Sequence, residues 1–144
     1  MSVIKIRFAR ISDAPKVADL CSQLGHAATQ GEIEERLRVV MKDPSQAILV
    51  AEVDDEVLGL VNVVAMYELL SGIQGRIWGL VVDDKARGLG LGRRLMEVAE
   101  KWVKEKGSST MKVNSNVKRV DAHKFYEKIG YEKYKEQAIF RKDL

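Results

Sequence analysis

Cysteine and long apolar runs are scarce in this chain, and each scarcity excludes a class of protein. The 144 residues include one cysteine, Cys21, so an internal disulfide framework is excluded and a reducing compartment is expected. No apolar run approaches the ~20 residues that a membrane span needs, and the N-terminus lacks the profile of a signal peptide. The sequence therefore predicts a cytoplasmic protein without a membrane partner.

Histidine and excess charge are scarce as well. The two histidines and the single cysteine form no spaced cluster, so no metal site is expected. The net charge of +3 is spread along the chain without a basic tail, and no recognisable reading helix or aromatic-rich sheet appears, so no nucleic-acid partner is expected. The hydrophobic fraction of 46% is ordinary for a globular protein, and the length predicts a single domain over residues 1–144.

The spacing of apolar residues predicts strands interleaved with helices. Strands are expected at residues 3–9, 46–53, 56–66, 76–82 and 110–114, and helices between residues 13 and 25, 29 and 44, 91 and 107, and 120 and 129. Residues 67–75 are expected to form a loop, and two closing strands at 131–134 and 137–141 a terminal hairpin. Charge runs such as residues 16–19 indicate solvated helix faces. Together these elements predict an α/β fold with a mixed sheet.

A glycine-rich turn at residues 83–92, between an expected strand and an expected helix, organises the chain. No Cβ keeps an anion from the backbone at its three alternate glycines, Gly88, Gly90 and Gly92. The first N–H groups of the next helix and the helix dipole favour an anion there. Charge and forked donors come from three arginines, Arg87, Arg93 and Arg94. The turn therefore predicts a pyrophosphate-binding site.

Two common phosphate loops are excluded at this turn. No Gly-Lys-Ser/Thr sequence follows it, and Arg93 stands where a dinucleotide fingerprint needs its third glycine. A different nucleotide-like ligand is therefore required. The alternative is a tight strand-to-helix connection flanked by ordinary surface arginines.

Two blocks of sequence resemble the GNAT superfamily of N-acetyltransferases. Residues 87–92 resemble its Arg/Gln-x-x-Gly-x-Gly/Ala signature, and residues 115–131 resemble its second recurrent block, which ends in Phe/Leu-Tyr-Glu-x-x-Gly-Phe/Tyr. The blocks occur in the family's order and at about its spacing. The resemblance implies a GNAT-like mixed, mostly antiparallel sheet of about seven strands with about four helices, splayed after the fourth strand.

The resemblance also implies a reaction. It implies direct transfer of an acetyl group from acetyl-CoA to a primary amine of a small molecule or peptide, without an acyl-enzyme. The acceptor is expected between residues 25–30, with the helix that follows, and the loop at 67–75. A rival interpretation is a non-catalytic acyl-CoA-binding sensor that uses the same turn. A homodimer is expected from prevalence alone.

Several residues receive roles from the resemblance. Tyr126 is the candidate general acid at the thioester sulfur; the alternative is an aromatic on the inner face of a helix beside Phe125. The backbone of Leu80, Val81 and Val82 is expected to pair with the pantetheine arm, and one N–H there to polarise the thioester carbonyl. The other residues expected to bind the coenzyme are Arg87, Gly88, Leu89, Gly90, Leu91, Gly92, Arg93, Asn116 and Arg119.

The general base is where this chain departs from the family. Many relatives carry a Glu on the fourth strand, where this chain has Trp78 followed by Gly79. A base matters because the attacking amine must be neutral, and a lysine-like amine has a pKa of about 10.4. Glu68 or a chain of waters is expected to replace the missing carboxylate. Trp78 is expected either to line the acceptor pocket or to be buried in the core.

Overall fold

The structure is a computed structural model that describes residues 2–144, and it divides into two compact units. The first unit, Met1–Val113, holds all the strands and the first three α-helices. The second unit, Asn114–Leu144, holds helix α4 (Val120–Lys128) and an extended C-terminal segment.

Five strands of the first unit form one sheet in the order β1-β2-β3-β4-β5. The strands are β1 (Ile4–Phe8), β2 (Gln46–Val53), β3 (Glu56–Glu68), β4 (Gly72–Val82) and β5 (Met111–Val113). The first three pairs are antiparallel, whereas β4 and β5 are parallel. A parallel pair needs a crossover connection, and α3 (Leu91–Glu105) supplies it.

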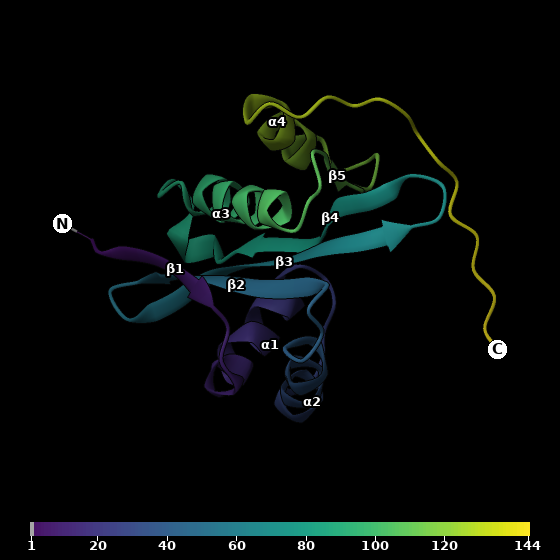
Figure 1. Ribbon diagram of the computed structural model, residues 1–144. Coiled ribbons are helices and arrows are strands. Elements are labelled where there is room, and N and C mark those ends of the chain that lie inside the picture. Colours follow the sequence, from purple (N-terminus) through teal and green to yellow (C-terminus); the bar gives the residue numbers. More distant parts are fainter. Residues whose placement is uncertain (1) are drawn as a thin grey trace. The chain divides into compact units, whose positions relative to one another are not determined.

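Helices cover both faces of this sheet. Figure 1 shows α1 (Ala14–Gln23) and α2 (Gln30–Val40) on one face and α3 on the other. Helix α2 begins with a capping box, in which Thr29 Oγ1 accepts from the Glu32 N–H and the Glu32 carboxylate accepts from the Thr29 N–H. Because both faces are covered, β3 carries buried apolar side chains on both sides, and Val61, Val63 and Val64 are fully buried.

Helix α3 lies close to β4, and this contact explains a glycine that the sequence analysis assigned to a loop. A Cβ at Gly75 would lie 2.4 Å from Val103 Cγ1 and 2.7 Å from the Thr110 carbonyl oxygen. Gly75 is therefore required by packing inside a strand. The prediction of a loop over residues 67–75 was wrong, because β3 runs to Glu68 and pairs there with Gly72 at the start of β4.

The predicted terminal hairpin is also absent. Residues 131–144 form no strand, and Ile139 and Phe140 are 87% and 93% exposed. A hairpin that packs no apolar face against a core is marginally stable in water, and charged residues separate the apolar ones here. The described sheet therefore has five strands instead of about seven, while the predicted mixed, mostly antiparallel α/β class is confirmed.

Candidate active site

Strand β4 continues beyond its parallel neighbour. Strand β5 pairs only with Gly75, Arg76 and Ile77 of β4. On that side, no strand within residues 2–144 pairs with β4 between Trp78 and Val82. An unpaired strand edge offers its N–H and C=O groups to an extended ligand. The splayed edge thus includes Leu80, Val81 and Val82, the backbone predicted to meet the pantetheine arm.

A β-bulge lies where β4 leaves β5. Asn62 of β3 pairs with Gly79 and Val63 pairs with Ile77, so Trp78 is the extra residue. A bulge bends its strand and changes the direction of a side chain. The Trp78 side chain is 55% exposed, which excludes the alternative of a buried core indole. The position where many relatives carry Glu therefore presents an exposed aromatic.

The turn after β4 is open on its outer side. The short 3-10 helix η2 (Asp84–Ala86) leads into the turn, and Asp83 Oδ1 caps it by accepting from the Lys85 N–H. Gly88 and Gly90 adopt φ of +89° and +74°, a left-handed conformation that favours glycine. A Cβ at either position would meet no atom within 4 Å. Beyond the immediate chain neighbours, no residue therefore fills the space beside these two glycines, as an anion site requires.

The first turn of α3 supplies unpaired donors. Gly90 is its N-cap and provides no side chain, and the first helical bond joins the Arg94 N–H to the Gly90 carbonyl at 3.2 Å. Within residues 2–144, the N–H groups of Leu91, Gly92 and Arg93 find no acceptor. The Leu91 side chain is buried, so it anchors the beginning of the helix. Three N–H groups and the positive end of the helix dipole thus face the open turn.

Two arginines beside the turn form only weak ion pairs. Arg87 pairs with Asp84 at 2.8 Å, and Arg93 pairs with Glu97 at 3.3 Å. All four side chains are mostly exposed, and exposed pairs of this kind contribute about 0–1 kcal/mol. Both guanidinium groups can therefore exchange their carboxylate for a phosphate at little cost. The residues present fit the diphosphate of a coenzyme.

Glu68, the candidate base, is held at the end of the β3–β4 hairpin. Its two carboxylate oxygens accept from Arg76, with Nη2 2.9 Å from Oε2 and 3.1 Å from Oε1. Glu68 pairs with Gly72 in the sheet, and Leu80 lies eight residues further along β4. At about 3.3 Å per residue, that separation is roughly 26 Å along the strand. Glu68 therefore lies far from the splayed edge, in an ion pair.

Tyr126 lies in the second unit on α4, among other aromatic rings. Its ring packs edge-to-face against Phe125 at 5.3 Å and Tyr131 at 6.0 Å between centroids. Burial raises the pKa of the Tyr126 phenol, and the positive charge of Arg119 opposes that rise. The phenol consequently keeps its proton at neutral pH, which is the state that a general acid needs.

Asn116 and Arg119 shape the turn that precedes α4. Asn116 Oδ1 accepts from the Lys118 N–H at 2.9 Å, and its carbonyl accepts from the Arg119 N–H at 3.0 Å. The same carbonyl lies 2.9 Å from His123 Nε2. Arg119 is the N-cap of α4 and makes no side-chain cap bond. Both residues thus take part in the local structure around the beginning of α4, and their contact with the coenzyme stays a prediction.

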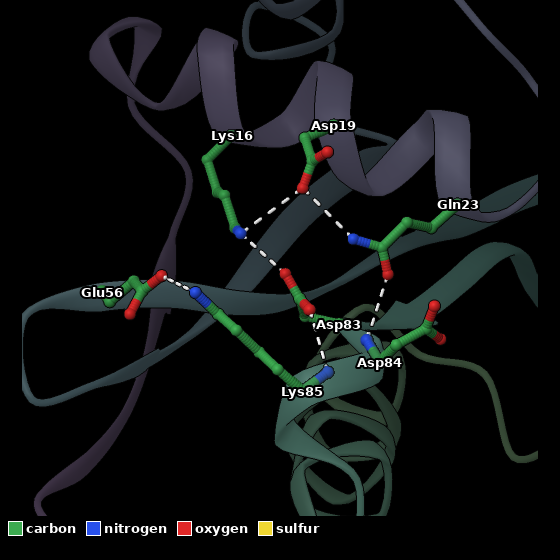
Figure 2. A network of polar contacts seen from close by, with 7 residues as sticks. All are labelled: Lys16, Asp19, Gln23, Glu56, Asp83, Asp84 and Lys85. Atoms are coloured by element: carbon green, nitrogen blue, oxygen red, sulfur yellow. Dashed lines mark hydrogen bonds and ion pairs between the residues drawn. The ribbon is translucent and has the colours of Figure 1, made fainter.

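Two residues that hold the beginning of the turn were not predicted from the sequence. Figure 2 shows Lys16 and Gln23 of α1 in contact with Asp83 and Asp84, which follow β4 directly. Lys16 and Asp83 are 67 positions apart, so local spacing could not pair them. The signal available in the sequence was an acidic residue directly after an apolar strand. Burial of a carboxylate at such a position is unfavourable unless it has a partner.

Comparison with known proteins identifies the family. The sequence profile of the Acetyltransferase (GNAT) family matches residues 17–131. The chain belongs to this family. It is 29% identical over 143 residues to an aminoalkylphosphonate N-acetyltransferase of Salmonella typhimurium, covering 98% of this chain and 90% of that protein. It is 27% identical over 144 residues to an aminoglycoside N(6')-acetyltransferase type 1 of Stenotrophomonas maltophilia, covering 96% and 93%.

A solved structure with the same fold is aminoglycoside N-acetyltransferase AAC(6')-Iy in complex with CoA. It superimposes with a TM-score of 0.90 at 17% sequence identity, over 100% of this chain and 97% of that one. Membership of the GNAT family confirms the prediction of an N-acetyltransferase enzyme. No helix within residues 2–144 is long and apolar enough to cross a membrane.

Proposed function

We propose that this GNAT protein transfers an acetyl group from acetyl-CoA directly to a primary amine of a small molecule or peptide. The observation that carries the proposal is the open, left-handed turn at Gly88 and Gly90, followed by three N–H groups without acceptors in residues 2–144. The names of the two curated relatives support a small-molecule amine as the acceptor. The family profile spans both compact units, which supports one functional domain over residues 1–144.

We assign the diphosphate of the coenzyme to the turn and the beginning of α3. The unpaired N–H groups there and the exposed guanidinium groups provide complementary charge and donors. The assigned residues are Arg87, Gly88, Leu89, Gly90, Leu91, Gly92 and Arg93. The splayed edge at Leu80, Val81 and Val82 is assigned to the pantetheine arm, and Asn116 and Arg119 of the second unit to further coenzyme contacts.

Two proton movements complete the proposal. Bound acetyl-CoA supplies a thioester, which is an acyl group activated for attack by an amine. Tyr126 Oη holds the proton that we assign to the departing sulfur, and burial favours this protonated state. On the acceptor side, the two candidates that can take the proton of the amine are Glu68 and a chain of waters. The roughly 26 Å between Gly72, its partner in the sheet, and Leu80 favours transfer through waters over direct contact.

The proposal is tested by thiol release from acetyl-CoA across a panel of primary amines, with CoA binding measured by calorimetry on the same samples. We expect amine-dependent thiol release by the wild-type protein. Tight CoA binding without release for any amine would favour the sensor interpretation instead. Absence of CoA binding would contradict both the acetyltransferase and the sensor interpretation. The homodimer and the cytoplasmic localisation expected from the sequence stay predictions.

A further inference from the structure

We propose that Lys16 and Gln23 of α1 are positioning residues for the coenzyme-binding turn, and that they act through Asp83 and Asp84 at the end of β4. This inference rests on the proposed function, because it concerns the same turn. Figure 2 shows the two side chains reaching from one face of α1 to two consecutive residues at the beginning of the turn.

The contacts between α1 and the turn involve both a side chain and the backbone. Lys16 Nζ donates to Asp83 Oδ2 at 2.6 Å, and Gln23 Oε1 accepts from the Asp84 N–H at 3.0 Å. Asp19 lies between them on α1, where its Oδ2 accepts from Lys16 Nζ at 3.4 Å and from Gln23 Nε2 at 3.1 Å. The carboxylate of Asp19 therefore holds both side chains in the orientation in which they meet the turn.

Asp83 is the fixed point of this network. It is 5% exposed, and a carboxylate at such a site depends on a charged partner. Its N–H donates to the Leu58 carbonyl of β3 at 2.8 Å, while its Oδ1 accepts from the Lys85 N–H at 3.1 Å. Asp83 is thus attached to α1, to β3 and to η2 at once. Removing Lys16 would leave a buried carboxylate without its cation.

The position of Asp83 and Asp84 fixes where the turn begins. The buried side chains of Ala86 and Leu91 fix the chain further along, and only the exposed glycine segment between them lacks an anchor. Glycine backbone has many accessible conformations, so unanchored N–H groups must be ordered when the ligand binds. The network on α1 therefore fixes one end of the glycine segment, and the N–H groups that we assign to the diphosphate lie at its other end.

The test compares Lys16→Met and Gln23→Leu with wild type. We expect the Kd for CoA to rise about tenfold in each variant. We also expect the KM for acetyl-CoA to rise by a similar factor, while kcat stays within about twofold, because no reacting group is removed. In the ligand-free protein, amide hydrogen exchange at residues 85–92 should become faster. Gln23 is exposed, so its variant should fold even if Lys16→Met does not.

Two controls separate positioning from general destabilisation. Lys85→Met removes an ion pair between the turn and Glu56 whose side chains are 57% and 51% exposed. An ion pair this exposed contributes little to holding the turn in place, so the Kd for CoA should change less than about twofold. Lys16→Arg retains the cation and should restore most of the affinity that Lys16→Met loses. If Lys85→Met and Lys16→Met lose CoA affinity equally, the inference is overturned.

A double-mutant cycle decides whether Lys16 acts through Asp83. In an Asp83→Asn background, Lys16→Met should cause little further loss of CoA affinity, because its partner charge is already gone. Fully additive losses would mean that Lys16 contacts the coenzyme directly, and the inference would be wrong. If wild type binds CoA and Lys16→Met binds it equally well, the inference fails while the proposed function stands. If wild type does not bind CoA, the proposed function fails.

Discussion

Gly90 and Gly72 form a natural matched pair for testing the coenzyme-binding turn. Both adopt φ of +74°, and a Cβ at either position would meet no atom within 4 Å. Alanine at either position therefore imposes the same backbone penalty without a steric clash. That penalty is about 1–2 kcal/mol for a left-handed residue. For a protein of this size, it should lower Tm by roughly 3–8 °C.

The two substitutions should differ in their effect on coenzyme binding. Gly72 begins β4 at the hairpin end, whereas Gly90 caps α3 at the turn assigned to the diphosphate. The methyl group of Gly90→Ala keeps phosphate oxygens from the backbone, and losing one charge-assisted hydrogen bond costs about 1.5–3 kcal/mol. The Kd for CoA should therefore rise about 10- to 100-fold in Gly90→Ala. It should stay near the wild-type value in Gly72→Ala.

Calorimetric titration with CoA and thermal unfolding of both variants provide the measurements. Similar Tm losses with a weaker Kd only in Gly90→Ala would support the assignment. If both variants lose affinity equally, the effect comes from stability and the reasoning is wrong. It is equally refuted if Gly90→Ala is less stable but binds CoA as wild type does.

Three further predictions concern packing, catalysis and pH. Gly75→Ala should destabilise the protein by about 1–3 kcal/mol in chemical denaturation, because its Cβ would lie 2.4 Å from Val103 Cγ1 and 2.7 Å from the Thr110 carbonyl oxygen; a free energy of unfolding equal to that of the wild type would contradict this packing. Tyr126→Phe should lower kcat by about 100-fold at an unchanged Kd for CoA; an unchanged kcat would remove its role as the acid. The hydrogen bond from Lys16 lowers the pKa of Asp83 from 3.8 to about 2, so Asp83 contributes stability above pH 4 that is lost as the pH falls towards 2. Relative to Asp83→Asn, the wild-type free energy of unfolding should therefore fall by about 1–2 kcal/mol over that interval, after allowance for screening. If the free energy of unfolding of the two proteins changes with pH in parallel, the prediction is contradicted.

The part of the fold that follows from local chemistry could be predicted from the sequence. The helix predicted to begin at residue 29 does so, because Thr29 and Glu32 form a capping box whose partners lie within one helical turn. The turn at Gly88 and Gly90 has the left-handed backbone that its glycines favour. These features depend on residues that are neighbours in sequence, so spacing and residue type are sufficient to find them.

The predictions that were wrong concern features that depend on contacts between residues far apart in the sequence. Gly75 was assigned to a loop because nothing in its neighbourhood indicates that Val103 of α3 lies against it. The closing hairpin was predicted from the spacing of apolar residues, whereas Phe140 is exposed and residues 131–144 form no strand. The bond between Lys16 and Asp83 joins a helix to the end of a strand far along the chain, so a solvated helix face was the natural interpretation of Lys16.

The most direct test of the central claim is a titration of isotope-labelled protein with CoA, followed by the amide resonances in NMR. If the diphosphate binds to the bare backbone of the turn, the largest shift changes should lie in residues 87–94, with smaller ones along residues 78–82. If CoA binds while the resonances of 87–94 stay unchanged and the largest changes cluster elsewhere, the account is contradicted.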